Sequence, residues 1–129
     1  MVGLFGRTPK DPQQKRNAEK IKEFKKLIKA QQYDRALKLG VSYLSDVPNN
    51  HDILFSVGGI YYLKKRYRTA ISYFDRALKI GSYDVEVLLL KAYSHQKLNE
   101  KAAAIKCCKK IQEVDPKNKN ASRMLSEMT

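Results

Sequence analysis

Two cysteines and two histidines are the residues of this sequence best suited to covalent or metal chemistry. Cys107 and Cys108 are adjacent, and His95 precedes them on the same stretch of chain. A thiolate beside an imidazole can act as a nucleophile, and both side chains can bind zinc. Two ligands do not complete a zinc site, however, and a buried free cysteine behaves as a small apolar residue. The sequence also has no glycine-rich phosphate loop, so we expect no enzyme, metal or other cofactor.

The composition limits the class of protein. A chain of 129 residues is long enough for one domain with an apolar core. No stretch approaches the roughly 20 apolar residues that a membrane span needs. The first residues are too short an apolar run for a signal peptide, and adjacent cysteines are no disulfide framework. We therefore expect a cytoplasmic protein without a membrane span, and the initial Met favours a near-complete unit.

The formal net charge of +13 is the second most informative property. Basic residues concentrate near the start of the chain, at Lys64-Lys65-Arg66, and around Lys106, Lys109 and Lys110. Such a charge favours an acidic protein, a nucleic acid or another polyanion as partner. The alternative is a lysine-rich surface that only keeps the protein soluble, because the charge is spread along the chain rather than gathered on one helix face.

An alanine recurs at 34-residue spacing, at Ala36, Ala70 and Ala104, each followed by an aliphatic residue. A fixed period of this length predicts a stack of helical hairpins rather than a compact globule. Other positions follow the same period, including Pro48 with Pro116 and the turn residues Asn50, Asp84 and Asn118. The prolines should end helices, and the three polar residues should cap the next ones.

The middle copy carries the pattern most fully, with Leu54, Gly58, Tyr61, Tyr67, Ala70, Phe74, Ala77 and Ile80. It resembles the tetratricopeptide repeat. The resemblance implies an all-α fold, a right-handed helical-hairpin solenoid of about seven helices in a single domain, 17–129. Its expected parts are a flexible N-terminal arm, 1–16, three repeats, 17–50, 51–84 and 85–118, and a C-terminal capping helix, 119–129.

The resemblance also implies a concave groove lined by the first helix of each hairpin. Some relatives hold the carboxylate of chaperone tails there with a clamp of Lys, Asn and Arg, but here only Lys25 could serve. The remaining lining is apolar and aromatic with lysines at its edges, and Gly59 opens a notch at its floor. The expected groove residues are Ile21, Lys25, Ile28, Lys29, Phe55, Gly59, Tyr62, Leu63, Leu89, Tyr93, Gln96 and Lys97.

This lining predicts a protein-interaction module, an adaptor, scaffold or chaperone-like protein that binds apolar-anchored, acidic-flanked peptide segments. The alternative for residues such as Ile21 and Leu89 is packing in the core. A different function is nucleic-acid or polyanion binding by the basic surface. A third is a homo-oligomer in which the arm, through Leu4 and Phe5, docks on itself or on a neighbouring molecule.

The resemblance also assigns the cysteines and histidines to structural positions. His95 and Cys108 fall at core positions of the repeat and should face the hairpin interior, near each other. Cys107, one residue along, should point toward solvent. We interpret His51, at the start of a predicted helix, as a turn or capping residue, and Gly58 as a site of close helix packing.

Overall fold

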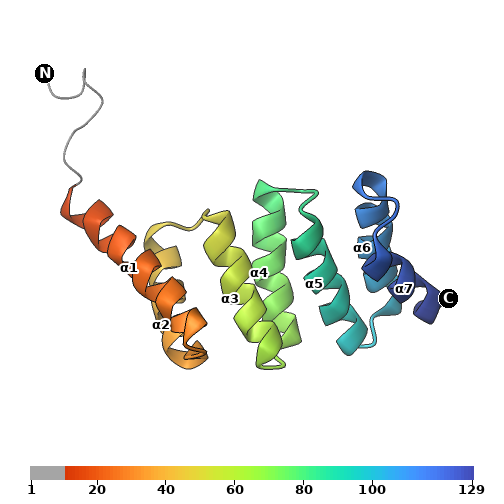
Figure 1. Cartoon of the computed structure of the whole chain (residues 1–129), viewed down its shortest axis with the longest axis horizontal. Helices are drawn as coiled ribbons and strands as arrows, with labels where there is room; N and C mark the ends of the chain where they lie inside the picture. The colour runs from red at the N-terminus through yellow and green to blue at the C-terminus, as the bar shows by residue number, and fades with distance from the viewer. Residues whose placement is uncertain (1–10) are drawn as a thin grey trace, which may run out of the picture. The chain divides into compact units, whose positions relative to one another are not determined.

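The computed structural model describes residues 11–129 and is all-α over that range (Figure 1). The described residues contain seven helices and no strand, which confirms the expected helical-repeat fold. In chain order the helices are α1 (Pro12–Lys29), α2 (Tyr33–Asp46), α3 (His51–Leu63), α4 (Tyr67–Ile80), α5 (Val85–Lys97), α6 (Lys101–Val114) and α7 (Lys119–Met128).

The chain divides into two compact units, where the sequence predicts one domain over residues 17–129. The N-terminal unit is Met1–Asp46, of which residues 11–46 are described, and the C-terminal unit is Val47–Thr129. Repeat proteins are held together hairpin by hairpin rather than by one central core, so separate compact units are compatible with the repeat.

Side-chain caps start the helices that follow each repeat boundary. The side chains of Asn50, Asp84 and Asn118 accept hydrogen bonds from the backbone N–H groups three residues later, at 3.1, 3.1 and 2.9 Å. Each bond satisfies a donor that the first helical turn leaves unpaired. Pro48 and Pro116 each come two residues after the last residue of α2 and α6. The period therefore located these helix boundaries correctly.

The turn inside each hairpin repeats an unusual backbone conformation. Gln31, Lys65 and Asn99 have φ angles of 57°, 62° and 59°, the only positive values among the non-glycine residues described. They are 34 residues apart. A residue with a Cβ atom is sterically strained in the left-handed backbone conformation. Asparagine tolerates this conformation better than lysine or glutamine. The fold therefore imposes this conformation at two positions whose residue type does not favour it.

In the N-terminal unit, α1 packs against α2. Phe24 and Leu27 from α1 are buried, as are Ala36 and Leu37 from α2. The sequence predicts a flexible arm over residues 1–16. This is wrong for residues 12–16, because helix α1 begins at Pro12. The cause is local: Asp11 accepts a hydrogen bond from the backbone N–H of Gln14 at 2.8 Å, and proline suits the first helical position.

In the C-terminal unit each helix from α3 to α7 packs against the next one, and α3 also contacts α5 (Figure 1). The capping helix α7 closes the last hairpin as expected, because its apolar stripe joins the core formed by α5 and α6. The buried members of that core are Leu88, Ala92, Ala104, Cys107, Cys108, Ile111, Ala121, Met124 and Met128.

Candidate functional site

Helix α3 presents four of the expected groove residues, Phe55, Gly59, Tyr62 and Leu63, along one side. Steps of three and four residues place side chains on the same helix face. Phe55, Gly59 and Tyr62 are partly buried, whereas Leu63 is 59% exposed. A leucine this exposed at the end of an apolar row lies on the surface and not in the core.

Helix α5 presents the equivalent four residues, Leu89, Tyr93, Gln96 and Lys97. Lys97 is exposed, and the other three are partly exposed. Leu89 and Tyr93 also pack against the core of α5, α6 and α7. Core packing, the alternative expected for Leu89, therefore accounts for part of its surface, and the remaining surface of Leu89 and Tyr93 is accessible to solvent.

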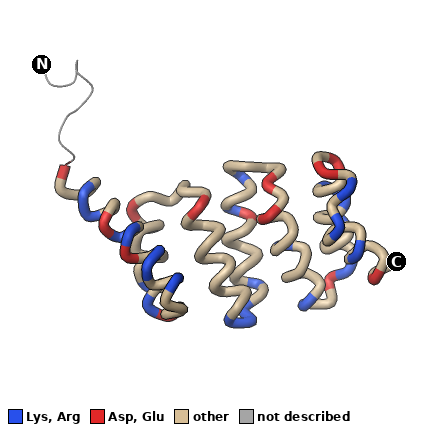
Figure 2. Tube along the Cα trace, viewed as in Figure 1, with Lys and Arg blue, Asp and Glu red and all other residues tan. Residues whose placement is uncertain are grey.

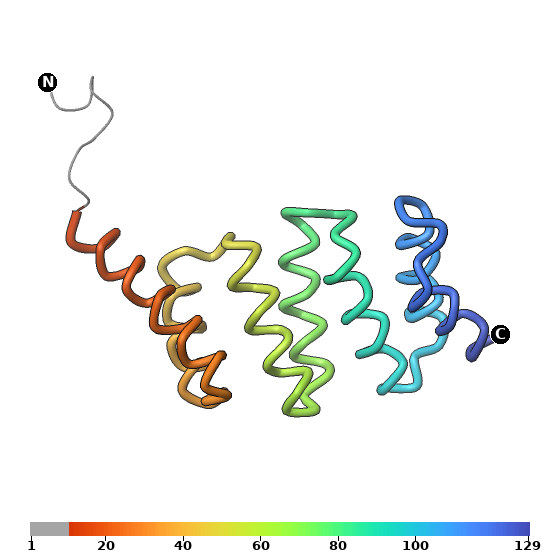
Figure 3. The backbone as a smooth tube through the Cα atoms, viewed as in Figure 1, coloured from red at the N-terminus to blue at the C-terminus, as the bar shows by residue number. Residues whose placement is uncertain are grey.

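The two sets of residues lie on neighbouring helices of the same unit. Helices α3 and α5 contact each other and run in the same direction (Figure 3). Burial raises the pKa of Tyr62, and the nearby Tyr67 and Tyr93 raise it further. The structure thus brings Tyr62 of α3 close to Tyr93 of α5. We call these eight residues the α3–α5 face: Phe55, Gly59, Tyr62, Leu63, Leu89, Tyr93, Gln96 and Lys97.

Aromatic rings of this face are held by rings behind them. The ring centroid of Phe55 lies 6.2 Å from that of the fully buried Phe74, with the planes tilted by 45°. The centroid of Tyr62 lies 5.4 Å from that of Tyr67 in an edge-on arrangement. Both separations are in the range favoured by aromatic pairs, so the two rings are held in place before any ligand binds.

The adjacent glycines Gly58 and Gly59 have opposite surroundings. A Cβ atom on Gly58 would lie 2.6 and 2.8 Å from ring atoms of Phe74 and 3.2 Å from the Cβ of Tyr73. This explains Gly58 by close helix packing, as expected. A Cβ atom on Gly59 would meet no atom within 4 Å. Helix packing therefore gives no reason for glycine at position 59.

The other four expected groove residues belong to α1 in the N-terminal unit. Ile21 and Ile28 are partly exposed, and Lys25 and Lys29 are exposed. On this helix the buried side chains are Phe24 and Leu27. The two isoleucines therefore have solvent-accessible surface beside the lysines, and their part in a groove stays a prediction.

Surface clefts lie on both units of the described chain, and one of them contains a residue of the α3–α5 face. A cleft of about 480 Å³ lies on the N-terminal unit beside Leu27 and Leu39. One of about 410 Å³ lies on α6, lined by Lys106, Lys109 and Lys110 among others. The third, about 270 Å³, joins Gln96 of α5 to α7. Its remaining lining residues are Asn99, Lys101, Glu127 and Met128.

The sequence interpretation missed two acidic residues at one end of the α3–α5 face. Asp52 precedes Phe55 by three residues, and Glu86 precedes Leu89 by the same step, so each lies on the same side of its helix as the face. The side chain of Asp52 is 92% exposed, and Glu86 is exposed. The 34-residue period that aligned the apolar rows aligns these two carboxylates as well, and it was the signal that could have found them.

The buried positions expected for His95 and Cys108 are confirmed, whereas their expected nearness to each other is not. His95 and Cys108 are buried, but each has another partner: His95 Nδ1 lies 2.8 Å from Glu100 Oε1, and Cys108 Sγ lies 3.5 Å from Met124 Sδ. The expected nearness of His95 to Cys108 therefore has no contact to support it. Among the described residues, no group of three His, Cys, Asp or Glu side chains is placed to hold a metal ion.

Cys107 corrects a second expectation, because it does not point toward solvent. It is 6% exposed and belongs to the core of α5, α6 and α7. Helix α6 packs against α5 on one side and α7 on another, so adjacent positions on it are both buried. Burial raises the pKa of the Cys107 thiol and raises that of Cys108 to about 11.

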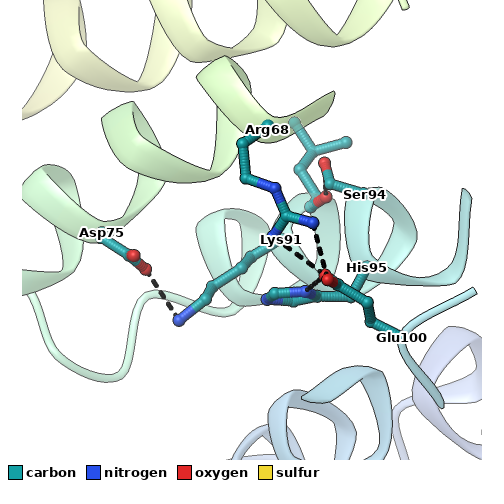
Figure 4. A network of polar contacts seen from close by, with 7 residues as sticks. Arg68, Asp75, Lys91, Ser94, His95 and Glu100 are labelled. Carbon is teal, nitrogen blue, oxygen red and sulfur yellow. Dashed lines mark hydrogen bonds and ion pairs between the residues drawn. The ribbon is translucent and has the colours of Figure 1, made fainter. Parts of the chain in front are cut away.

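A polar network joins α4, α5 and α6 (Figure 4). Arg68 donates two hydrogen bonds to the carboxylate of Glu100, at 3.1 and 2.6 Å, and His95 contacts the same carboxylate. The hydrogen bonds from Arg68 and then His95 lower the pKa of Glu100 to about 2. Lys91 pairs with Asp75 at 2.7 Å in the same region. These ion pairs connect neighbouring repeats.

His51 also has a structural role, though not as a cap. Asn50 caps α3, and His51 is the first helical residue. Its Nε2 lies 3.2 Å from Asp84 Oδ2, so it links α3 to the turn before α5.

No helix among the described residues is long and apolar enough to cross a membrane.

The fold is shared with solved structures of tetratricopeptide-repeat (TPR) domains. The first TPR domain of Spaghetti (RPAP3), bound to the HSP90 peptide SRMEEVD, has a TM-score of 0.78 at 18% identity and covers 87% of this chain and 89% of its own. The second TPR domain of human RPAP3, in complex with the HSP70 peptide SGPTIEEVD, has a TM-score of 0.76 at 16% identity, with coverage of 84% and 91%. The Arabidopsis OM64 TPR domain has a TM-score of 0.77 at 13% identity, with coverage of 87% and 93%.

Sequence comparison gives one family. No curated protein sequence matches the chain. The family model described as anaphase-promoting complex, cyclosome, subunit 3 matches residues 29–111, more than half of the chain. The helical hairpins, the 34-residue period and this match agree with one another. The chain belongs to this family, among the tetratricopeptide-repeat proteins.

Proposed function

We propose that this chain is a protein-interaction module that binds short, apolar-anchored segments of other proteins on the α3–α5 face. In this role it serves as an adaptor or scaffold, and the work is done by burial of apolar side chains. The observation that carries the proposal is Gly59, which leaves open space between Phe55 and Tyr62 on a partly exposed apolar face.

A glycine inside a helix costs about 1 kcal/mol relative to alanine, and no packing neighbour requires one at position 59. A bound side chain that occupies this space would bury apolar surface against Phe55 and Tyr62. Both rings are braced by other aromatics, and rigid aromatic residues are the ones that anchor interfaces.

The similar structures support the class of ligand, but the residues of this chain differ from the clamp that such relatives use. RPAP3 domains are solved with the peptides SRMEEVD and SGPTIEEVD, which end in acidic residues. At the positions of the clamp of Lys, Asn and Arg, only Lys25 of this chain is suited to it, and the others are Ile21, Phe55, Gly59, Leu89 and Tyr93. Apolar anchors therefore carry the binding we propose, and a terminal carboxylate is not needed.

A displayed library of random 14-residue peptides, selected on the full chain, tests this function. Peptides recovered on the wild type should bind Gly59→Leu at least tenfold more weakly, because the new side chain fills the space that the anchor needs. The matched control is Ser126→Leu, which introduces the same side chain at an exposed position of α7. Circular dichroism verifies that both variants keep the helical content.

The proposal fails if every recovered peptide binds wild type, Gly59→Leu and Ser126→Leu with the same affinity. It also fails if selection recovers no peptide above background. Either result would show that the open position on α3 is not used for binding.

Polyanion binding is a second candidate, favoured by the cleft on α6. Lys106, Lys109 and Lys110 line this cleft together with Ala102, Ile105 and one acidic residue, Glu113. A single-stranded 20-nucleotide RNA is a suitable probe, because phosphate-driven affinity falls steeply with salt. If the cleft binds RNA, changing the three lysines to serine should weaken binding and reduce the salt dependence. A salt-independent affinity, or no loss in that variant, would reject this candidate.

A further inference from the structure

The α3–α5 face has opposite charges at its two ends. Asp52 and Glu86 lie in the first turns of α3 and α5, and Lys97 is the last residue of α5. Figure 2 shows acidic residues near the start of both helices and basic residues near their ends. Between these ends the face is apolar and aromatic. A ligand that lies along the helices would therefore meet negative charge at one end and positive charge at the other.

The dimensions of the face suit a short helix. Helices α3 and α5 have 13 residues each, which corresponds to about 20 Å. Phe55 and Tyr62 are seven residues apart, so their rows are separated by about 10 Å along the axis. Apolar residues at i and i+7 of a bound helix have the same separation. The open space at Gly59 lies between these rows, where the ligand's residue i+3 or i+4 would fall.

Electrostatics gives the direction of that helix. Because α3 and α5 run in the same direction, their dipoles add, and a ligand helix is favoured when it runs opposite to them. A helix is itself stabilised by acidic residues in its first turn and basic residues in its last. In the antiparallel orientation the acidic first turn meets Lys97, and the basic last turn meets Asp52 and Glu86.

We propose that the α3–α5 face binds an amphipathic α-helix of three to four turns, antiparallel to α3 and α5. Its first turn is acidic, its last turn is basic, and an apolar stripe faces Phe55, Tyr62 and Tyr93. This inference rests on the proposed function and adds to it the conformation, the direction and the charge order of the partner segment.

The peptide selection described above also tests the charge order, if the sequences of the recovered peptides are compared. We expect Asp and Glu to be enriched in the first third and Lys and Arg in the last third, with apolar residues spaced by three and four. A recovered peptide should lose about tenfold in affinity when its charged ends are exchanged at constant composition. That size follows from a few exposed ion pairs, each contributing a factor of roughly 1.4 to 5.

A charge-reversed protein gives the decisive control. The variant Asp52→Lys/Glu86→Lys/Lys97→Glu should prefer the peptide whose ends have been exchanged. The matched control makes the same kinds of change at exposed positions of α1, as Glu19→Lys/Glu23→Lys/Lys22→Glu. This control should keep the wild-type preference, because its net charge changes by the same amount but the α3–α5 face is unchanged.

The possible outcomes separate this inference from the proposed function. Peptides that depend on Gly59 but show no charge order, or the reverse order, overturn the antiparallel helix and leave the binding function intact. Alternating apolar residues in the recovered peptides would show an extended ligand and would also overturn it. If no recovered peptide depends on Gly59, both the function and the inference fail.

Discussion

The neighbouring glycines of α3 offer the sharpest test of the structure, because one substitution should have opposite effects at the two positions. Gly58→Ala places a Cβ atom 2.6 Å from the Cε1 atom of Phe74, far inside the contact distance of about 3.5–4.0 Å for two carbons. Phe74 is fully buried, so its ring has little room to move. Gly59→Ala adds the same atom where nothing lies within 4 Å.

The expected free energies follow from two opposing effects. Replacing glycine by alanine inside a helix stabilises it by about 1 kcal/mol at either position. At position 58 this gain is offset by overpacking, which typically costs 1–3 kcal/mol and should reach roughly the upper value when two ring atoms must shift. We expect Gly58→Ala to lower the free energy of unfolding by about 1–2 kcal/mol. Gly59→Ala should raise it by about 0.5–1 kcal/mol.

Urea titration followed by circular dichroism measures both variants against the wild type. With a typical denaturant slope of about 1–3 kcal/mol/M, the two midpoints should differ by roughly 1 M. A Gly58→Ala protein as stable as wild type would contradict the packing of Gly58 against Phe74. A destabilised Gly59→Ala protein would contradict the open space at that position.

Three further predictions concern other parts of the chain. Lys65→Gly should stabilise the protein by up to about 1 kcal/mol, because glycine adopts φ of 62° without strain, and thermal unfolding would detect the change. The lowered pKa of Glu100 means that its contacts stabilise the fold above pH 4.5 and that this contribution is lost as pH falls from 4.5 toward about 2. Glu100→Gln should therefore flatten the pH dependence of stability in that range, and an unchanged acid titration would contradict the Arg68 contact. The thiols of Cys107 and Cys108 should react with a thiol reagent only after unfolding, because they are buried and their pKa values are raised. Rapid reaction of either thiol in the native protein would show that the core of α5, α6 and α7 is open.

Part of the candidate site was visible in the sequence. The period made Phe55 equivalent to Leu89, Gly59 to Tyr93 and Tyr62 to Gln96, and the structure confirms that all six are partly exposed on neighbouring helices. Their use in binding remains a proposal. The opposite charges at the two ends of the face were missed, because only the apolar rows were followed along the period.

The sequence alone determined the features that depend on neighbouring residues and on the 34-residue period. These features are the seven helices between residues 11 and 129, the caps at Asn50, Asp84 and Asn118, and the packing of α7 on the last hairpin. Asp11-Pro12 also marks the true start of α1, and this signal was present but not used. Such features follow from local hydrogen bonding and from periodicity, which one sequence contains in full.

Only the tertiary structure decided the features that depend on contacts between helices. It buried Cys107, paired His95 with Glu100 instead of Cys108, and gave Gly58 and Gly59 opposite surroundings. It also forced a left-handed backbone on Lys65, whose residue type does not favour it. The physical reason is that burial, ion pairing and free space are set by which side chains a neighbouring helix brings close. The spacing of residues along one helix does not contain that information.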